Sequence, residues 1–179
     1  MSRAGDLGAR RIVLAAGLLG LGACGRERPG PEPAGGPPAL PVVRALPPEA
    51  FRLEWTAHTI PSVMKARASE RVSVTVRNSS TVPWPAVTST GNQPPQAGAV
   101  RLAYRWWSGS SPLPVVEPGT RADLDRPVAA GESATLGIVV TAPSVPADYV
   151  LQLDLLQELV SFFEPHGADQ LLVPVQVRE

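Results

Sequence analysis

The side chains that could support catalysis or metal binding are few and widely separated in this 179-residue chain. His58 and His166 are the only histidines and Cys24 is the only cysteine, whereas a zinc site usually needs three or four His, Cys or carboxylate ligands. Asp123 and Asp125 do not lie in the twelve-residue carboxylate pattern of a calcium loop. We therefore expect no metal and no cofactor.

Two other polar arrangements could do chemistry. Asp154 and Glu158 could act as the acid and base of a glycosidase, because that reaction needs two carboxyl groups. The serines of residues 108–111 could supply a nucleophile, but no Gly-x-Ser-x-Gly motif surrounds them. A small domain without large loops offers no deep cleft for either reaction. The sequence therefore favours a chain that is not an enzyme.

Tryptophan and arginine side chains are better candidates, for binding. Two-residue alternation along one expected strand places Arg101, Arg105 and Trp107 on the face opposite Trp106. Arg and Trp are the residue types enriched at binding hot spots, and a tryptophan can also stack on a sugar. Trp84 is a further candidate binding residue, or else it caps one end of the core. Trp107 could likewise only cover the sheet, and the arginines could only solvate it.

The first 23 residues have the pattern of an export signal. Arginines precede an apolar run at residues 12–23, which is too short to span a bilayer core of about 30 Å. The run ends in Leu-Gly-Ala before Cys24, and this ending resembles the lipobox of bacterial lipoproteins. The resemblance implies that Cys24 is lipidated, becomes the new N-terminus and holds the protein on a membrane. The alternative is a plain secretory leader.

The expected location is the bacterial cell envelope, facing the periplasm or the cell exterior. The pair Arg10-Arg11 resembles a twin-arginine signal, so both that route and the general secretory route stay open. Gly25 is not the aspartate that typically retains such lipoproteins at an inner membrane, which implies the outer membrane in a Gram-negative host.

Residues 24–50 form the expected linker. Prolines and glycines dominate it and no hydrophobic periodicity is present, so we expect a solvated, partly polyproline-II tether. The whole chain has 16 Lys and Arg and 16 Asp and Glu, which gives no net charge. This balance predicts no binding to nucleic acid, because such proteins carry a basic patch.

Residues 51–179 predict one all-β domain, an Ig-like antiparallel sandwich of about seven or eight strands. Short alternating runs are separated by turn residues, as in sandwiches. Residues 157–163 are ambiguous, because their apolar positions also suit a helix. Pro174 is expected where one side of the last strand has no partner. The main expected strands are residues 52–58, 71–77, 99–107, 133–141, 148–156 and 171–177.

Two residues favour the Ig-like topology over a generic sandwich. Trp106 occupies the third long strand, where Ig domains bury a tryptophan, and we expect it to face Val74 and Leu153. Tyr149 opens the penultimate long strand, at the position of a tyrosine corner.

Several segments resemble known Ig-like families. The four-tryptophan Ig-like domain of selective autophagy receptors and bacterial extracytoplasmic proteins is similar at residues 76–78, 82–85, 128–132 and 140–143 and at Tyr149. Ig-like modules of bacterial surface-polysaccharide proteins are similar at residues 102–106, 154–158 and 162–163. The resemblance implies an interaction module without catalysis. The leading hypothesis is an envelope lipoprotein that binds a protein, and the alternative is a carbohydrate-binding module for surface polysaccharide.

Overall fold

The structure, a computed structural model, describes residues 43–87, 96–109, 111, 113–115 and 120–179. Within these residues, short 3-10 helices are found at η1 (Pro48–Ala50) and η2 (Glu164–His166), and no helix is long and apolar enough to cross a bilayer. The strands are β1 (Leu53–His58), β2 (Val63–Lys65), β3 (Ser69–Asn78), β4 (Val100–Ser108), β5 (Arg121–Asp123), β6 (Ser133–Thr141), β7 (Ala147–Gln157), β8 (Ser161–Phe162) and β9 (Leu171–Arg178).

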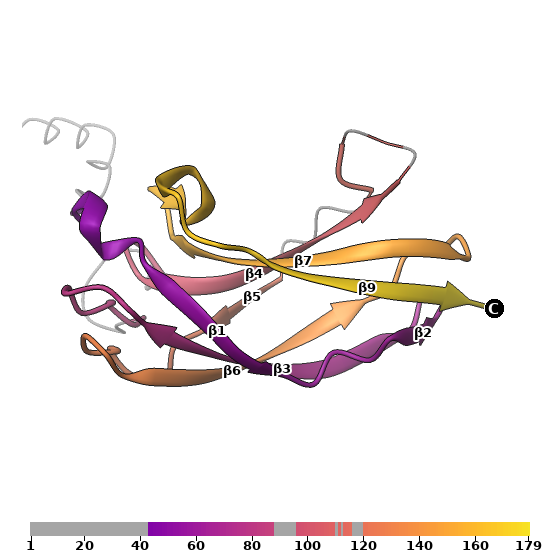
Figure 1. The fold of residues 1–179 in the computed structure, drawn as a ribbon, viewed down its shortest axis with the longest axis horizontal. Coiled ribbons are helices and arrows are strands. Elements are labelled where there is room, and N and C mark those ends of the chain that lie inside the picture. Colours follow the sequence, from indigo (N-terminus) through magenta and orange to yellow (C-terminus); the bar gives the residue numbers. More distant parts are fainter. Residues whose placement is uncertain (1–42, 88–95, 110, 112, 116–119) are drawn as a thin grey trace, which may run out of the picture. The chain divides into compact units, whose positions relative to one another are not determined.

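The strands form two sheets that pack as two layers (Figure 1). The first has the order β1-β3-β6, and the second has the order β2-β9-β7-β4-β5, with β8 paired to the end of β7. If the strands are lettered as in Ig domains, the first sheet is A-B-E and the centre of the second is G-F-C. The predicted all-β, Ig-like sandwich is therefore confirmed. The pairing of β2 with β9 is the parallel exception in an antiparallel fold.

Alternating apolar residues fill the space between the sheets. Val72, Val74 and Val76 of β3 are buried against Leu151 and Leu153 of β7, as members of one core cluster. These residues share the inner face because a strand turns every second side chain to the same side. The sequence periodicity thus identified the inner face correctly.

Trp106 lies in the centre of this core. It is fully buried, and its indole Nε1 donates a hydrogen bond to the carbonyl oxygen of Thr141 at 2.9 Å. The Tyr149 ring packs edge-on against it, with the ring centroids 6.0 Å apart. The Tyr149 hydroxyl donates to the carbonyl oxygen of Val145 at 2.9 Å, four residues upstream. The buried tryptophan and the tyrosine corner are both confirmed.

Three short strands were not predicted: β2, β5 and β8 contain only two or three residues each. Residues 157–163 form a turn and β8 rather than a helix, and Leu159 has a positive φ of 64° with 64% of its surface exposed. Pro174 lies, as expected, where one side of β9 has no strand partner. On that side, β2 pairs only with residues from Gln176 onward, and the Gln176 N–H donates to the Ser62 carbonyl.

The described domain includes contacts to residues before residue 51, within the segment predicted as linker. The side-chain amide of Gln157 is buried and bonds two linker residues: Oε1 accepts from the Leu46 N–H at 2.8 Å, and Nε2 donates to the Arg44 carbonyl at 3.0 Å. Ala50 in η1 is fully buried. Composition alone suggested a solvated segment, but a polar side chain 111 positions away satisfies its backbone. The linker residues 24–42, Cys24 included, lie outside the described residues.

Candidate functional site

The outer face of the β2-β9-β7-β4-β5 sheet carries an apolar row. Trp107 of β4 lies opposite Val150 of β7, which lies opposite Pro174 of β9. Trp107 and Val150 are half-buried and Pro174 is exposed. Because the three strands are adjacent, the three side chains form one continuous strip, which we call the apolar row.

A second row lies beside it and combines polar and apolar groups. Arg105 of β4 pairs with Gln152 of β7, which pairs with Leu172 of β9. Leu172 has 56% of its surface exposed, whereas Gln152 is buried. The Arg105 guanidinium lies over the ring of Phe162, 4.1 Å from its centroid, which is the geometry of a cation–π contact. The two rows give this face apolar contact area next to a positioned cation.

Trp107 is held in place by the second row. Its indole Nε1 donates to Oε1 of Gln152, so the N–H is already satisfied. The ring is therefore the part of Trp107 that a partner could contact. Strict alternation along β4 was predicted from the sequence, and the outward position of Trp107 next to the buried Trp106 confirms it.

Arg101 lies on the same face but its guanidinium is occupied. Nε binds Asp123 at 2.5 Å and Nη1 binds Glu158 at 3.0 Å, and the side chain is only 15% exposed. Arg101 therefore ties β4 to β5 and to the turn after β7. Of the three candidate binding residues on this strand, Arg105 and Trp107 belong to the two rows. Arg101 instead stabilises the contact of β4 with its neighbours.

Trp84 is not part of a binding surface, and the expectation that it could be is wrong. It is fully buried, its Nε1 donates to the Ala50 carbonyl at 2.9 Å, and its ring packs edge-on against Phe163 at 5.5 Å. Its backbone bridges to Val128. The alternative, in which Trp84 caps one end of the core, is confirmed, and burial of the large ring is the physical reason.

Asp154 is a buried carboxyl group on the outer side of β7. Oδ2 accepts from the Glu164 N–H at 3.3 Å, and Oδ1 has no hydrogen-bond partner among the described residues. Burial raises the pKa of Asp154 to about 7, against smaller lowering effects of backbone N–H groups and of Arg105. Asp154 lines only a very small hollow beneath Phe162. Glu158, its suggested partner in acid–base chemistry, is engaged with Arg101.

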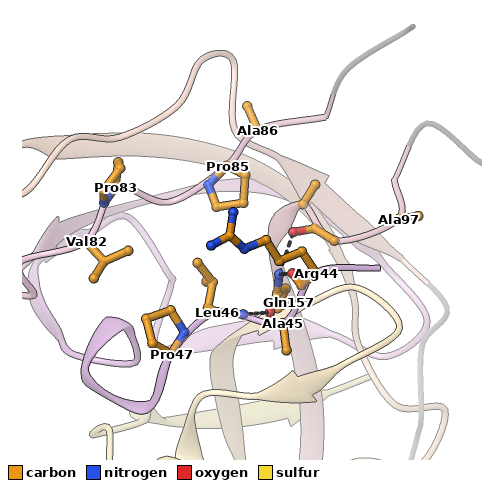
Figure 2. A pocket seen from close by; sticks show the side chains of 12 residues that line it. Arg44, Ala45, Leu46, Pro47, Val82, Pro83, Pro85, Ala86, Ala97 and Gln157 are labelled. Atoms are coloured by element: carbon orange, nitrogen blue, oxygen red, sulfur yellow. Dashed lines mark hydrogen bonds between the residues drawn. The ribbon is translucent and has the colours of Figure 1, made fainter. Parts of the chain in front are cut away.

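A cavity of about 510 Å³ opens where the linker meets the domain (Figure 2). Leu46 and Pro47 lie on one side and Val82 and Pro83 on another, and the Arg44 side chain extends between Leu46 and Pro85. The described residues of the lining are mostly apolar and include no carboxylate or histidine. This cavity could not be predicted from the sequence, because its walls come from segments far apart in the chain.

The two histidines serve separate local roles. His58 Nδ1 accepts from the Ile60 N–H at 3.3 Å, and the exposed His166 stacks on Phe51 with the ring centroids 3.8 Å apart. In the part of the chain that the structure describes, no three His, Cys, Asp or Glu residues gather to hold a metal ion.

Some residues of this face were not singled out from the sequence. Leu172 belongs to the outward set of the last strand, so alternation along β9 could have found it. Gln152 belongs to the outward set of β7, so alternation along β7 could also have found it. Phe162 carried no such signal, because its position depends on β8 folding back onto β7. Gln157 and its contacts with the linker were equally hidden.

Comparisons with known proteins find only distant similarity. No family model and no curated protein matches the chain. Among solved structures, the CARDB domain of a Pyrococcus furiosus protein, solved in complex with di-metal ions, has 10% identity and a TM-score of 0.40 over 71% of this chain and 84% of that one. A β-glucosidase from Listeria innocua has 15% identity and a TM-score of 0.40 over 72% of this chain and 16% of the enzyme.

A further similar structure is AvmM, which catalyses macrocyclization in alchivemycin A biosynthesis. It has 9% identity and a TM-score of 0.37 over 73% of this chain and 90% of that one. Likenesses this distant say nothing about activity or ligand. The Ig-like assignment comes from the strand order and the tyrosine corner, and the resemblance to the four-tryptophan domain stays an expectation.

Proposed function

We propose that this chain is a non-catalytic cell-envelope lipoprotein, anchored to a membrane through Cys24, that presents its Ig-like domain to a protein partner. The outer face of the β2-β9-β7-β4-β5 sheet is the contact surface. The observation that supports it is the apolar row of Trp107, Val150 and Pro174 with the exposed Leu172 beside it.

The side chains of the two rows favour a protein over a glycan. A sugar site needs a groove with polar groups around an accessible ring, but the N–H of Trp107 and the amide oxygen of Gln152 already bind each other. Protein interfaces instead combine an apolar centre with aromatic and arginine side chains. Trp107, Leu172 and Arg105 supply this combination.

Site-specific photo-crosslinking in the producing cells tests the contact surface. A photoreactive residue is placed at Leu172 or, as a matched control, at Val145, because their exposed fractions are similar, 56% and 62%, and Val145 lies in the loop after β6. We expect a discrete protein adduct from Leu172 and none from Val145. Adding Trp107→Ala should weaken the Leu172 adduct.

Other outcomes would contradict the proposal in different ways. Equal adducts at both positions, or an adduct at Val145 alone, would move the site to the end loops. A domain that forms no protein adduct but is retained by cell-surface polysaccharide would replace the protein partner with a glycan.

A further inference from the structure

Strand β6 ends the β1-β3-β6 sheet with an edge that lacks the usual protection against further pairing. Ser133–Thr141 is nine residues long, contains no charged residue and no proline, and pairs with β3 in one unbroken register. Natural sheet edges are usually short, charged, bulged or covered, because a regular free edge is a template for another strand. β6 has none of the first three devices, and the segment 124–126 lies beside its first residues, Ser133–Thr135.

The other edge strands among the described residues, β1, β2 and β5, do carry such protection. β1 carries a bulge between Trp55 and Ala57, and the Trp55 Nε1 ties it to the Asp169 carbonyl. β2 is three residues long and ends in Lys65, and β5 is three residues long with two charged residues. β6 is therefore the exception within a molecule that protects its edges.

The hydrogen-bond parity shows which groups β6 leaves open. Ala142 N–H and Glu132 C=O point to β3, so the even positions face the sheet. Thr141 faces the other way, where its N–H and C=O bind Tyr104 and Trp106. The odd positions before it thus point their backbone groups to the free edge. Within the described part of the chain, these groups form no backbone hydrogen bond at Ser133, Thr135, Gly137 and Val139.

The side chain of Arg71 places a cation beside the centre of this edge. Nη1 of the exposed Arg71 lies 3.2 Å from where a Cβ on Gly137 would be, so the absence of a side chain there lets the guanidinium rest over the strand. Arg71 has no ion-pair partner among the described residues, whereas Arg77 on the same face binds Glu54 at 3.4 Å. A residue opposite Gly137 on an added strand would have its Cβ about 5 Å away, within reach of Arg71.

We propose that the free edge of β6 takes up an extended segment of a partner protein as an additional strand, and that Arg71 selects a segment with a carboxylate side chain opposite Gly137. Main-chain hydrogen bonds would hold such a strand, and side chains would select it. A second copy of this chain fits less well, because symmetric pairing about Gly137 would bring two Arg71 side chains together.

The test uses the full chain with Cys24→Ala and labelled peptides as long as β6. The peptides alternate threonine and valine, with either glutamate or lysine at the centre, and binding is followed by fluorescence anisotropy. We expect the glutamate peptide to bind about tenfold more tightly than the lysine peptide, the effect of one ion pair of about 1.4 kcal/mol. Arg71→Glu should reverse this preference, and the matched variant Arg77→Glu should preserve it.

Gly137→Pro tests the edge itself. The Gly137 N–H points away from β3, so proline removes a donor of the free edge and none of the β3 ladder, and binding of both peptides should be lost. If this variant fails to fold, the charge reversal at Arg71 decides. The proposal is overturned if neither peptide binds, if both bind wild type equally, or if sedimentation shows a dimer that Gly137→Pro dissociates.

Discussion

At the scale of single residues, Asp154 shows how burial can change a side chain's chemistry without making it catalytic. One oxygen accepts the Glu164 N–H and the other has no partner among the described residues. The groups that face it are Arg105 from β4 and Glu164 from η2, and burial outweighs the Arg105 charge, so the pKa rises to about 7. A neutral carboxyl group therefore suits this position better than an anion.

The resulting pH dependence has a definite sign. An aspartate in the unfolded chain ionises near pH 4, so between about pH 4 and about pH 7 the folded state binds more protons. Stability from this group is therefore greatest at low pH and falls as pH rises through that window, by at most about 4 kcal/mol.

The variant Asp154→Asn should remove this contribution. Between about pH 5 and about pH 8, the free energy of unfolding in urea should fall less for the variant than for wild type. The variant should be the more stable protein at the higher pH. Asp148→Asn is the matched control, because it makes the same change at an exposed position of the same strand. Equal pH profiles for wild type and Asp154→Asn would contradict the prediction.

At the scale of elements, β4 divides its two tryptophans between opposite sides of one sheet. Trp106 is fully buried between the sheets, and Trp107 is half-buried on the outer face. The division follows from the two-residue period of a strand, and the pairing of β4 with β7 fixes it over nine successive residue pairs.

Truncation should separate the two roles. Trp106→Ala should cost about 3–5 kcal/mol, because it leaves a cavity and also frees the Thr141 carbonyl. Trp107→Ala should cost about 1 kcal/mol, since it removes a partly exposed ring and one side-chain hydrogen bond. Urea unfolding of the two variants checks the order, and a larger loss for Trp107→Ala would contradict it.

At the scale of the whole molecule, the described chain begins beside η1 at one end of the sandwich, and β9 carries the C-terminus to the other end (Figure 1). The Gln157 amide fixes the start of the domain by bonding Arg44 and Leu46, so these two residues belong to the domain.

Removal of the anchor should release the protein from the membrane. Cys24→Ala deletes the thiol that would carry the lipid, and stable anchoring requires more than one acyl chain, so the variant should move from the detergent-extracted fraction to the soluble fraction. Ser2→Ala, a change in the leader that keeps the cysteine, should leave the distribution unchanged. Equal detergent fractions for wild type and Cys24→Ala would show that the protein is not held by a lipid.

The alternating sequence by itself determined most of the core. The runs that contain Val74, Trp106 and Leu153 place these side chains inward in any sheet, because strand geometry is local and has a fixed period. Tyr149 and Trp106 further limited the sandwich to an Ig-like topology.

Only the tertiary structure decided which outward residues share a surface. Whether Trp84 is buried depends on Ala50 and Phe163, which come from segments distant in sequence. The cross-strand neighbours of Trp107 depend on register, and the open edge of β6 depends on the order of strands in its sheet. Such properties arise from long-range pairing, which a periodic pattern read along one chain does not contain.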